Sequence, residues 1–170
     1  TSGGKVTLVS VNMGKADFSA KALPSTVDAD EIIDYPVKIA GRHYNITCVN
    51  VGNPHCVVFT DNVDRIDLEE IGPKFEHNKI FPERTNTEFV KVISPQKLKM
   101  RVWERGAAVT LACGTGACAT LTACVLNKKT ADEITLHLDG GDLYLHFGAD
   151  GHVYMRGVAE EVFEGWCDIY

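Results

Sequence analysis

The residues with the clearest potential for chemistry form one run, Ala112–Ala119, which reads Ala-Cys-Gly-Thr-Gly-Ala-Cys-Ala. Cys113 stands directly before a glycine-rich turn from which a helix is expected to begin. Unpaired N–H groups at a helix N-terminus bind anions and lower the pKa of a nearby thiol. We therefore expect a reactive thiolate at Cys113 and a cradle for a substrate carboxylate beside it. The plainer interpretation is a small buried side chain at a tight turn.

Two further pairs of polar residues lie next to expected strands. Glu104 and Arg105 end one strand, and the arginine offers a two-pronged fork for a carboxylate. Asn53 and His55 precede an apolar strand, where an amide can bind an amino-acid head group and a histidine can tune a thiol. The alternatives are a charge pair at a strand edge and a turn followed by an ordinary strand histidine.

A fourth polar segment, residues 82–87, contains Asn86 and leads into another strand. Taken by itself, Asn86 is interpreted as an ordinary turn residue. The other five histidines are scattered without the spacing of metal ligands, so no metal site is predicted. No second Cys-Gly pair occurs in the chain.

Composition limits the class of protein. The chain has 170 residues, of which 45% are hydrophobic, so we expect residues 1–170 to form a single domain with a real core. A net charge of −6 argues against nucleic acid or an anionic membrane as a partner, and no apolar run is long enough to span a bilayer. Six cysteines without a Cys-x-x-Cys pair favour a reducing, cytoplasmic compartment. The chain begins at Thr1, which indicates a removed leader or a piece of a longer protein.

Period-two alternation and turn residues predict strands, and two segments have helical patterns. A capping box at 67–70 starts a short helix, and the second helix runs from Gly114 to about Lys128 with one apolar stripe along it. Residues 13–34 are expected to form a long surface connection. The predicted strands are 5–12, 35–40, 44–50, 54–60, 86–93, 97–103, 133–138, 143–147 and 152–158. This pattern favours an α+β fold, a curled and mostly antiparallel, barrel-like sheet around a central helix.

Four blocks, taken in order, resemble the diaminopimelate epimerase family. They are Gly-Asn-Pro-His-Cys at 52–56, Glu-Arg-Thr-Asn-Thr-Glu-Phe at 83–89, Trp-Glu-Arg-Gly at 103–106, and the cysteine run at 112–119. The resemblance is to the C-terminal lobe of that two-lobed enzyme. It implies that the whole chain is one α+β lobe with a helix inside a curled sheet.

The resemblance also implies an activity, the interconversion of LL- and meso-diaminopimelate on the route to lysine and peptidoglycan precursors. The family uses no cofactor: two cysteines, one from each lobe, remove and return the α-proton on opposite faces. Cys113 would be one of them, with His55 and Glu104 near the thiols. The residues implied to bind substrate are Asn53, Asn86, Glu104 and Arg105, with the backbone N–H groups of Gly114 and Thr115 holding its carboxylate.

The family's other motif, a Cys-Gly-Asn-Gly run in the first lobe, is absent from this chain. We therefore expect the chain alone to be inactive, to need the N-terminal lobe as partner, and to self-associate, for example as a homodimer, through an uncovered apolar face. Two alternatives stay open. One is a related two-thiol isomerase of the proline racemase type, whose substrate has no distant amino-acid group for Arg105 to hold. The other is a non-catalytic binding module with an unreactive thiol.

Overall fold

One curled sheet carries most of the chain. The computed structural model describes residues 6–160 and 162–168. The strand order in the sheet is β1-β10-β9-β8-β6-β5-β4-β3-β2, with β7 paired to β6. The strands are β1 (Val9–Asn12), β2 (Tyr35–Ile39), β3 (Arg42–Asn50), β4 (Pro54–Phe59), β5 (Asn86–Ser94), β6 (Lys97–Glu104), β7 (Ala108–Thr110), β8 (Glu133–Leu138), β9 (Gly141–Phe147) and β10 (Val153–Gly157).

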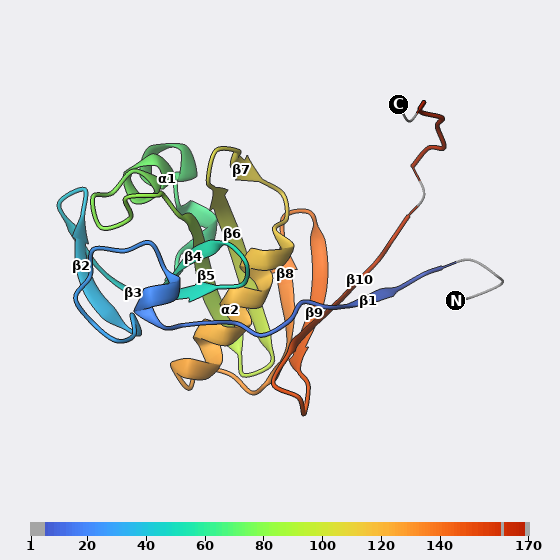
Figure 1. Ribbon diagram of the computed structural model, residues 1–170, viewed down its shortest axis with the longest axis horizontal. Helices are drawn as coiled ribbons and strands as arrows, with labels where there is room; N and C mark the ends of the chain where they lie inside the picture. The colour runs from blue at the N-terminus through green and yellow to red at the C-terminus, as the bar shows by residue number, and fades with distance from the viewer. Residues whose placement is uncertain (1–5, 161, 169–170) are drawn as a thin grey trace.

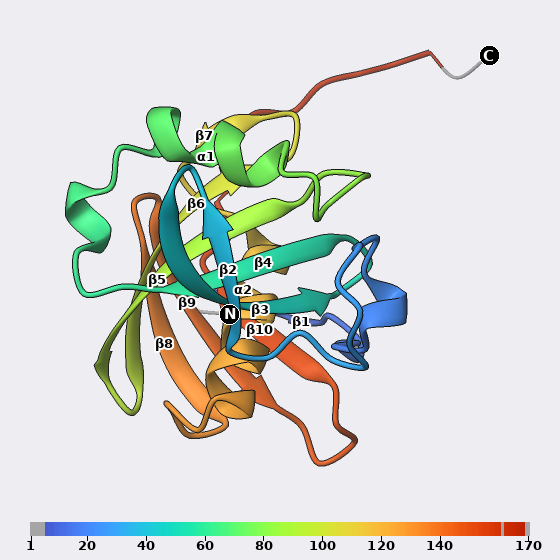
Figure 2. The same ribbon diagram turned by 90° about the vertical axis from the view of Figure 1, so that its left-hand side faces the viewer.

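Most neighbouring strands are antiparallel, as the turn signals in the sequence predict. Among the described strands, β4–β5 and β6–β8 pair in parallel. The first parallel pair places His55 beside Asn86, so two of the candidate residues lie at the same end of adjacent strands. The sheet curls around a helix but does not close, because β1 and β2 remain as its edges (Figures 1 and 2).

The enclosed helix is α2 (Gly114–Leu126), which lies in the hollow of the sheet (Figure 1). It is buried continuously from Gly116 to Cys124, so the predicted single apolar stripe is too narrow. The reason is that the sheet wraps around the helix: β3, β4 and β5 approach it from one side and β8, β9 and β10 from the other. A helix that is apolar all round is a core helix, and α2 is the centre of the larger of two hydrophobic clusters.

The second helix, α1 (Leu68–Glu76), packs outside the curl against β5, β6 and β7. The side chain of Asp67 accepts a hydrogen bond from the N–H of Glu70 at 3.0 Å, so the predicted cap is confirmed. The ring of Phe75 meets that of Phe89 on β5 edge-on, with 5.5 Å between centroids. This contact belongs to the second hydrophobic cluster, which fills the space under α1.

The predicted α+β architecture is confirmed, with differences at its margins. The first strand is shorter than expected: residues 6–8 are not part of it, and position 5 lies outside the described residues. Strand β7 and two short 3₁₀ helices, η1 (Ala20–Ala22) and η2 (Val63–Arg65), were not predicted, because three-residue elements leave no periodic pattern. Neither helix of the described residues is long and apolar enough to cross a membrane.

Candidate active site

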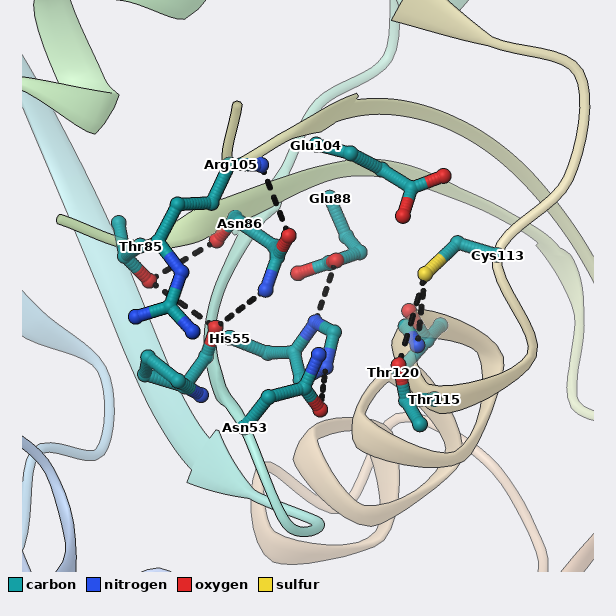
Figure 3. A network of polar contacts seen from close by, with 12 residues as sticks. Asn53, His55, Thr85, Asn86, Glu88, Glu104, Arg105, Cys113, Thr115 and Thr120 are labelled. Atoms are coloured by element: carbon teal, nitrogen blue, oxygen red, sulfur yellow. Dashed lines mark hydrogen bonds and ion pairs between the residues drawn. The ribbon is translucent and has the colours of Figure 1, made fainter. Parts of the chain in front are cut away.

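Cys113 caps the N-terminus of α2. Its Sγ accepts a hydrogen bond from the N–H of Gly116 at 3.3 Å and lies 3.6 Å from the hydroxyl oxygen of Thr115 (Figure 3). Gly116 must be glycine here, because a Cβ at that position would lie 3.2 Å from the sulfur and 2.7 Å from Oε1 of Glu88. The sequence therefore places the thiol at the end of the helix, as predicted, in a space too small for another side chain.

The expected thiolate is wrong for this chain by itself. Burial raises the pKa of Cys113 to about 11. The hydrogen bonds from Thr115 and Gly116 lower this pKa and the charges of Glu88 and Glu104 raise it, each by less than burial does. The helix N-terminus does act on the sulfur, but desolvation is the larger effect. In the lobe alone the residue is a thiol at neutral pH, in the form that donates a proton.

His55 lies between an amide and a carboxylate. On the buried strand β4, its ring is fully enclosed, with Nδ1 2.7 Å from Oε1 of Glu88 and Nε2 2.8 Å from Oδ1 of Asn53 (Figure 3). Both ring nitrogens therefore have an oxygen partner. The histidine is held rigidly, and its orientation is set by residues from two segments.

Asn86 connects three segments of the site. It begins β5, where Nδ2 donates to the carbonyl of Pro54 at 2.8 Å and Oδ1 accepts from the backbone N–H of Arg105 at 2.9 Å. The side chain is almost wholly buried. Its observed contacts fix the start of β4 against the turn after β6.

Glu104 and Arg105 lie at the end of β6 and diverge. Glu104 accepts a hydrogen bond from the hydroxyl of Thr110 on β7, and its carboxylate is on the Cys113 side of the site in Figure 3. The exposed guanidinium of Arg105 lies across the site and donates to the carbonyl of Glu83 at 3.1 Å. The tight turn that follows them contains Gly106, whose φ is +78°.

Two buried carboxylates have no role in the sequence interpretation. Glu88 touches His55 and lies next to Cys113, and Glu76 accepts hydrogen bonds from Trp103 Nε1 at 2.7 Å and from the N–H of Gly106 at 3.1 Å. The available signal for Glu88 is a carboxylate directly before the apolar pair Phe89 and Val90 of the same strand, since charged residues are almost never buried without a partner.

The structure brings the predicted residues to one end of the sheet and of α2. Gly114 and Thr115 form the first turn of the helix beside the thiol, so their N–H groups are at the same helix end. Within the described ranges, no three side chains of metal-binding type gather as ligands. A separate surface hollow of about 430 Å³ lies between α1 and strands β3–β4, and none of the predicted site residues lines it.

A capped thiol beside carboxylates and a histidine defines a site for acid–base chemistry on an epimerase-type fold. A solved hydroxyproline epimerase from Agrobacterium vitis has this fold: its TM-score is 0.62 at 12% identity, covering 93% of this chain and 51% of that one. The sequence profile of the diaminopimelate epimerase family matches residues 47–162. The chain belongs to that family.

Curated relatives agree with this assignment. A diaminopimelate epimerase from Cyanothece sp. is 51% identical in an alignment that covers 92% of this chain, and one from Agathobacter rectalis is 49% identical in an alignment that covers 97% of it. The matches cover 57% and 61% of those relatives. The chain thus spans about three fifths of the length of the relatives it matches.

Proposed function

We propose that this chain is the C-terminal lobe of a diaminopimelate epimerase and that it carries one of the enzyme's two catalytic thiols. Cys113 exchanges a proton with the α-carbon on one face of LL- or meso-diaminopimelate, and a cysteine of the first lobe serves the other face. The observation that carries the proposal is the position of the Cys113 thiol, which caps the N-terminus of α2 at the end of the sheet where the other candidate residues gather. Identity of about 50% to curated diaminopimelate epimerases favours this function over that of a proline racemase.

The chemistry suits this arrangement. Removal of an α-proton builds negative charge on the adjacent carboxylate, and fixed N–H dipoles stabilise such charge best in a site without water. We assign the N–H groups of Gly114 and Thr115 to that carboxylate. Proton transfer between thiols and carbon needs no cofactor. Two bases are required, because a single base would return the proton to the face it left.

The distant amino-acid group of the substrate requires ligands of its own. We assign it to Asn53, Asn86, Glu104 and Arg105, which supply hydrogen-bond donors and acceptors. Arg105 is exposed and opposite Cys113 in Figure 3, which supports a place at the far end of a long substrate. We assign His55 and Glu104 to the catalytic group together with Cys113. Binding energy from the far end can then serve the reaction at the α-carbon.

The first lobe is the partner that we propose. Exposed apolar side chains gather on the segments that extend from the body of the domain, Val9 and Val11 on β1 and Phe163 and Trp166 beyond β10 (Figure 1). Such surfaces are typical of interfaces. In the chain alone, the same surface is expected to favour homodimers, which sedimentation at several concentrations will test.

We infer in addition that residues 1–170 act as one domain and that the protein works in the cytoplasm or another reducing compartment. The supporting observation is that Cys48 and Cys56, which face each other across β3 and β4, are both free.

Fusion of this chain to the unmatched part of the Agathobacter rectalis relative tests the function. The assay follows deuterium from solvent into the α-position of LL-diaminopimelate. We expect no exchange with the chain alone, exchange with the fusion, and a loss of at least about a hundredfold in Cys113→Ser. Cys118→Ser is the matched control, since that buried cysteine lies five residues further along the same helix. Robust exchange by the chain alone, or by the Cys113→Ser fusion, contradicts the proposal.

The alternatives give different outcomes in the same assay. A fusion that exchanges proline or hydroxyproline but not diaminopimelate indicates an isomerase of the proline racemase type. A folded fusion that exchanges none of the three amino acids indicates a binding module.

A further inference from the structure

A carboxylate to which the sequence interpretation assigns no role lies between the histidine and the thiol of the site. Glu88 is on β5 and its side chain is completely buried. Oε1 is 2.7 Å from Nδ1 of His55, while Oε2 has no hydrogen-bond partner among the described residues. A buried carboxylate with one unpaired oxygen is unfavourable unless its position serves another purpose.

Glu88 also reaches the first turn of α2. A side chain at Gly116 would collide with its Oε1 and press against the sulfur of Cys113. The glycine therefore lets strand β5 and the helix approach until the carboxylate and the thiol share one small space. Glu88 contacts the histidine directly and acts on the thiol through its charge.

We propose that Glu88 is a positioning residue of this site, which fixes the ring of His55 through Nδ1 so that Nε2 faces Asn53. A carboxylate on one ring nitrogen determines which nitrogen is presented to a reaction, as in the orienting pair of a catalytic triad. The consequence for catalysis rests on the proposed epimerase function. The contact between Glu88 and His55 does not, because both residues lie in this chain.

The charge of Glu88 has a second effect. The charged groups that act on Cys113 are Glu88 from β5 and Glu104 from β6, and Cys113 in turn raises the pKa of Cys118 on α2. Burial raises the pKa of the thiol first, and the negative charges of Glu88 and Glu104 add to this. Loss of the Glu88 charge is therefore expected to increase the thiolate fraction of Cys113 at a given pH.

Proton–nitrogen NMR of the histidine rings in the 170-residue chain tests the proposal, with His55 assigned from a His55→Asn variant. The wild type is expected to show a downfield, slowly exchanging Nδ1–H signal for His55. In Glu88→Gln, which keeps the shape but removes the charge, this signal moves upfield and exchanges faster. The same variant is expected to react about threefold or more faster at Cys113 with a disulfide reagent at pH 8.

Two controls separate positioning from general loss of stability. Glu104→Gln removes the other nearby carboxylate, so it should speed the reaction of Cys113 but leave the His55 signal in place. Glu76→Gln removes a buried carboxylate that does not touch His55. It should change neither the His55 Nδ1–H signal nor the reaction rate of Cys113. A folded Glu88→Gln chain with an unaltered His55 signal overturns the proposal, as does an equal shift of that signal in Glu104→Gln. These measurements need no substrate and no second lobe, so their outcome is independent of epimerase activity.

Discussion

Cys113 should react with disulfides much more slowly than a free cysteine, although it caps a helix. At pH 8, a thiol with a pKa of about 11 is roughly 0.1% thiolate, against about a quarter for a free cysteine with a pKa near 8.5. Its thiolate is intrinsically more nucleophilic by about tenfold to twentyfold over that pKa difference. The net expectation is a rate about 20-fold below that of a cysteine peptide, before any steric protection.

The assay uses a Cys167→Ser background, since Cys167 is the exposed cysteine and the other four besides Cys113 are fully buried. A dipyridyl disulfide reports the reaction by absorbance between pH 7 and 10, and Cys113→Ser in the same background identifies the signal. The rate should rise about tenfold per pH unit without a plateau, because the pH stays below the pKa. Steric access changes the absolute rate but not this slope. A plateau below pH 8.5 would refute the conclusion that burial outweighs the helix N-terminus in setting the pKa of Cys113.

Three substitutions elsewhere extend these predictions. Gly116→Ala gains about 1 kcal/mol of helix propensity but collides with Glu88, so calorimetry should show a net loss of about 1 kcal/mol. Gly72→Ala places a Cβ 2.2 Å from the ring of Trp103, and a loss of about 1–3 kcal/mol in urea unfolding is expected. Glu76 has a lowered pKa, because hydrogen bonds, mainly from Trp103, outweigh its burial. The contribution of Glu76 to the free energy of unfolding is therefore present above pH 4.5 and lost as the pH falls. In an acid titration, the stability of Glu76→Gln should decline less steeply than that of the wild type.

Local sequence signals predicted most of the fold because they act over short distances. The Asp67 cap and the small residues after Cys113 each depend on a few neighbouring positions. The candidate residues were also found locally, since each follows or precedes a strand or helix end. Their convergence, however, depends on pairings such as that of His55 with Asn86, which no local pattern contains.

The features that sequence missed are set by tertiary packing. Strand β5 is buried on both faces, so alternation cannot show that Glu88 points at His55. The pKa of Cys113 depends on how deeply the curled sheet encloses the helix end. The sequence motif around Cys113 is compatible with either a raised or a lowered pKa. A helix N-terminus predicts a cradle for negative charge, but only the depth of burial decides whether the thiol itself becomes charged.

The protonation state of Cys113 affects how a slow reaction with disulfide reagents is interpreted. A two-base epimerase needs one thiol and one thiolate at the start of each turnover, since one group donates a proton while the other accepts. Burial and two nearby carboxylates place Cys113 in the donor form in the lobe alone. Slow modification is therefore expected both from a catalytic thiol and from an inert one, and it cannot separate the epimerase from a binding module. Solvent-deuterium exchange by the fused protein separates them, because only a thiol that reaches the α-carbon can exchange its proton there.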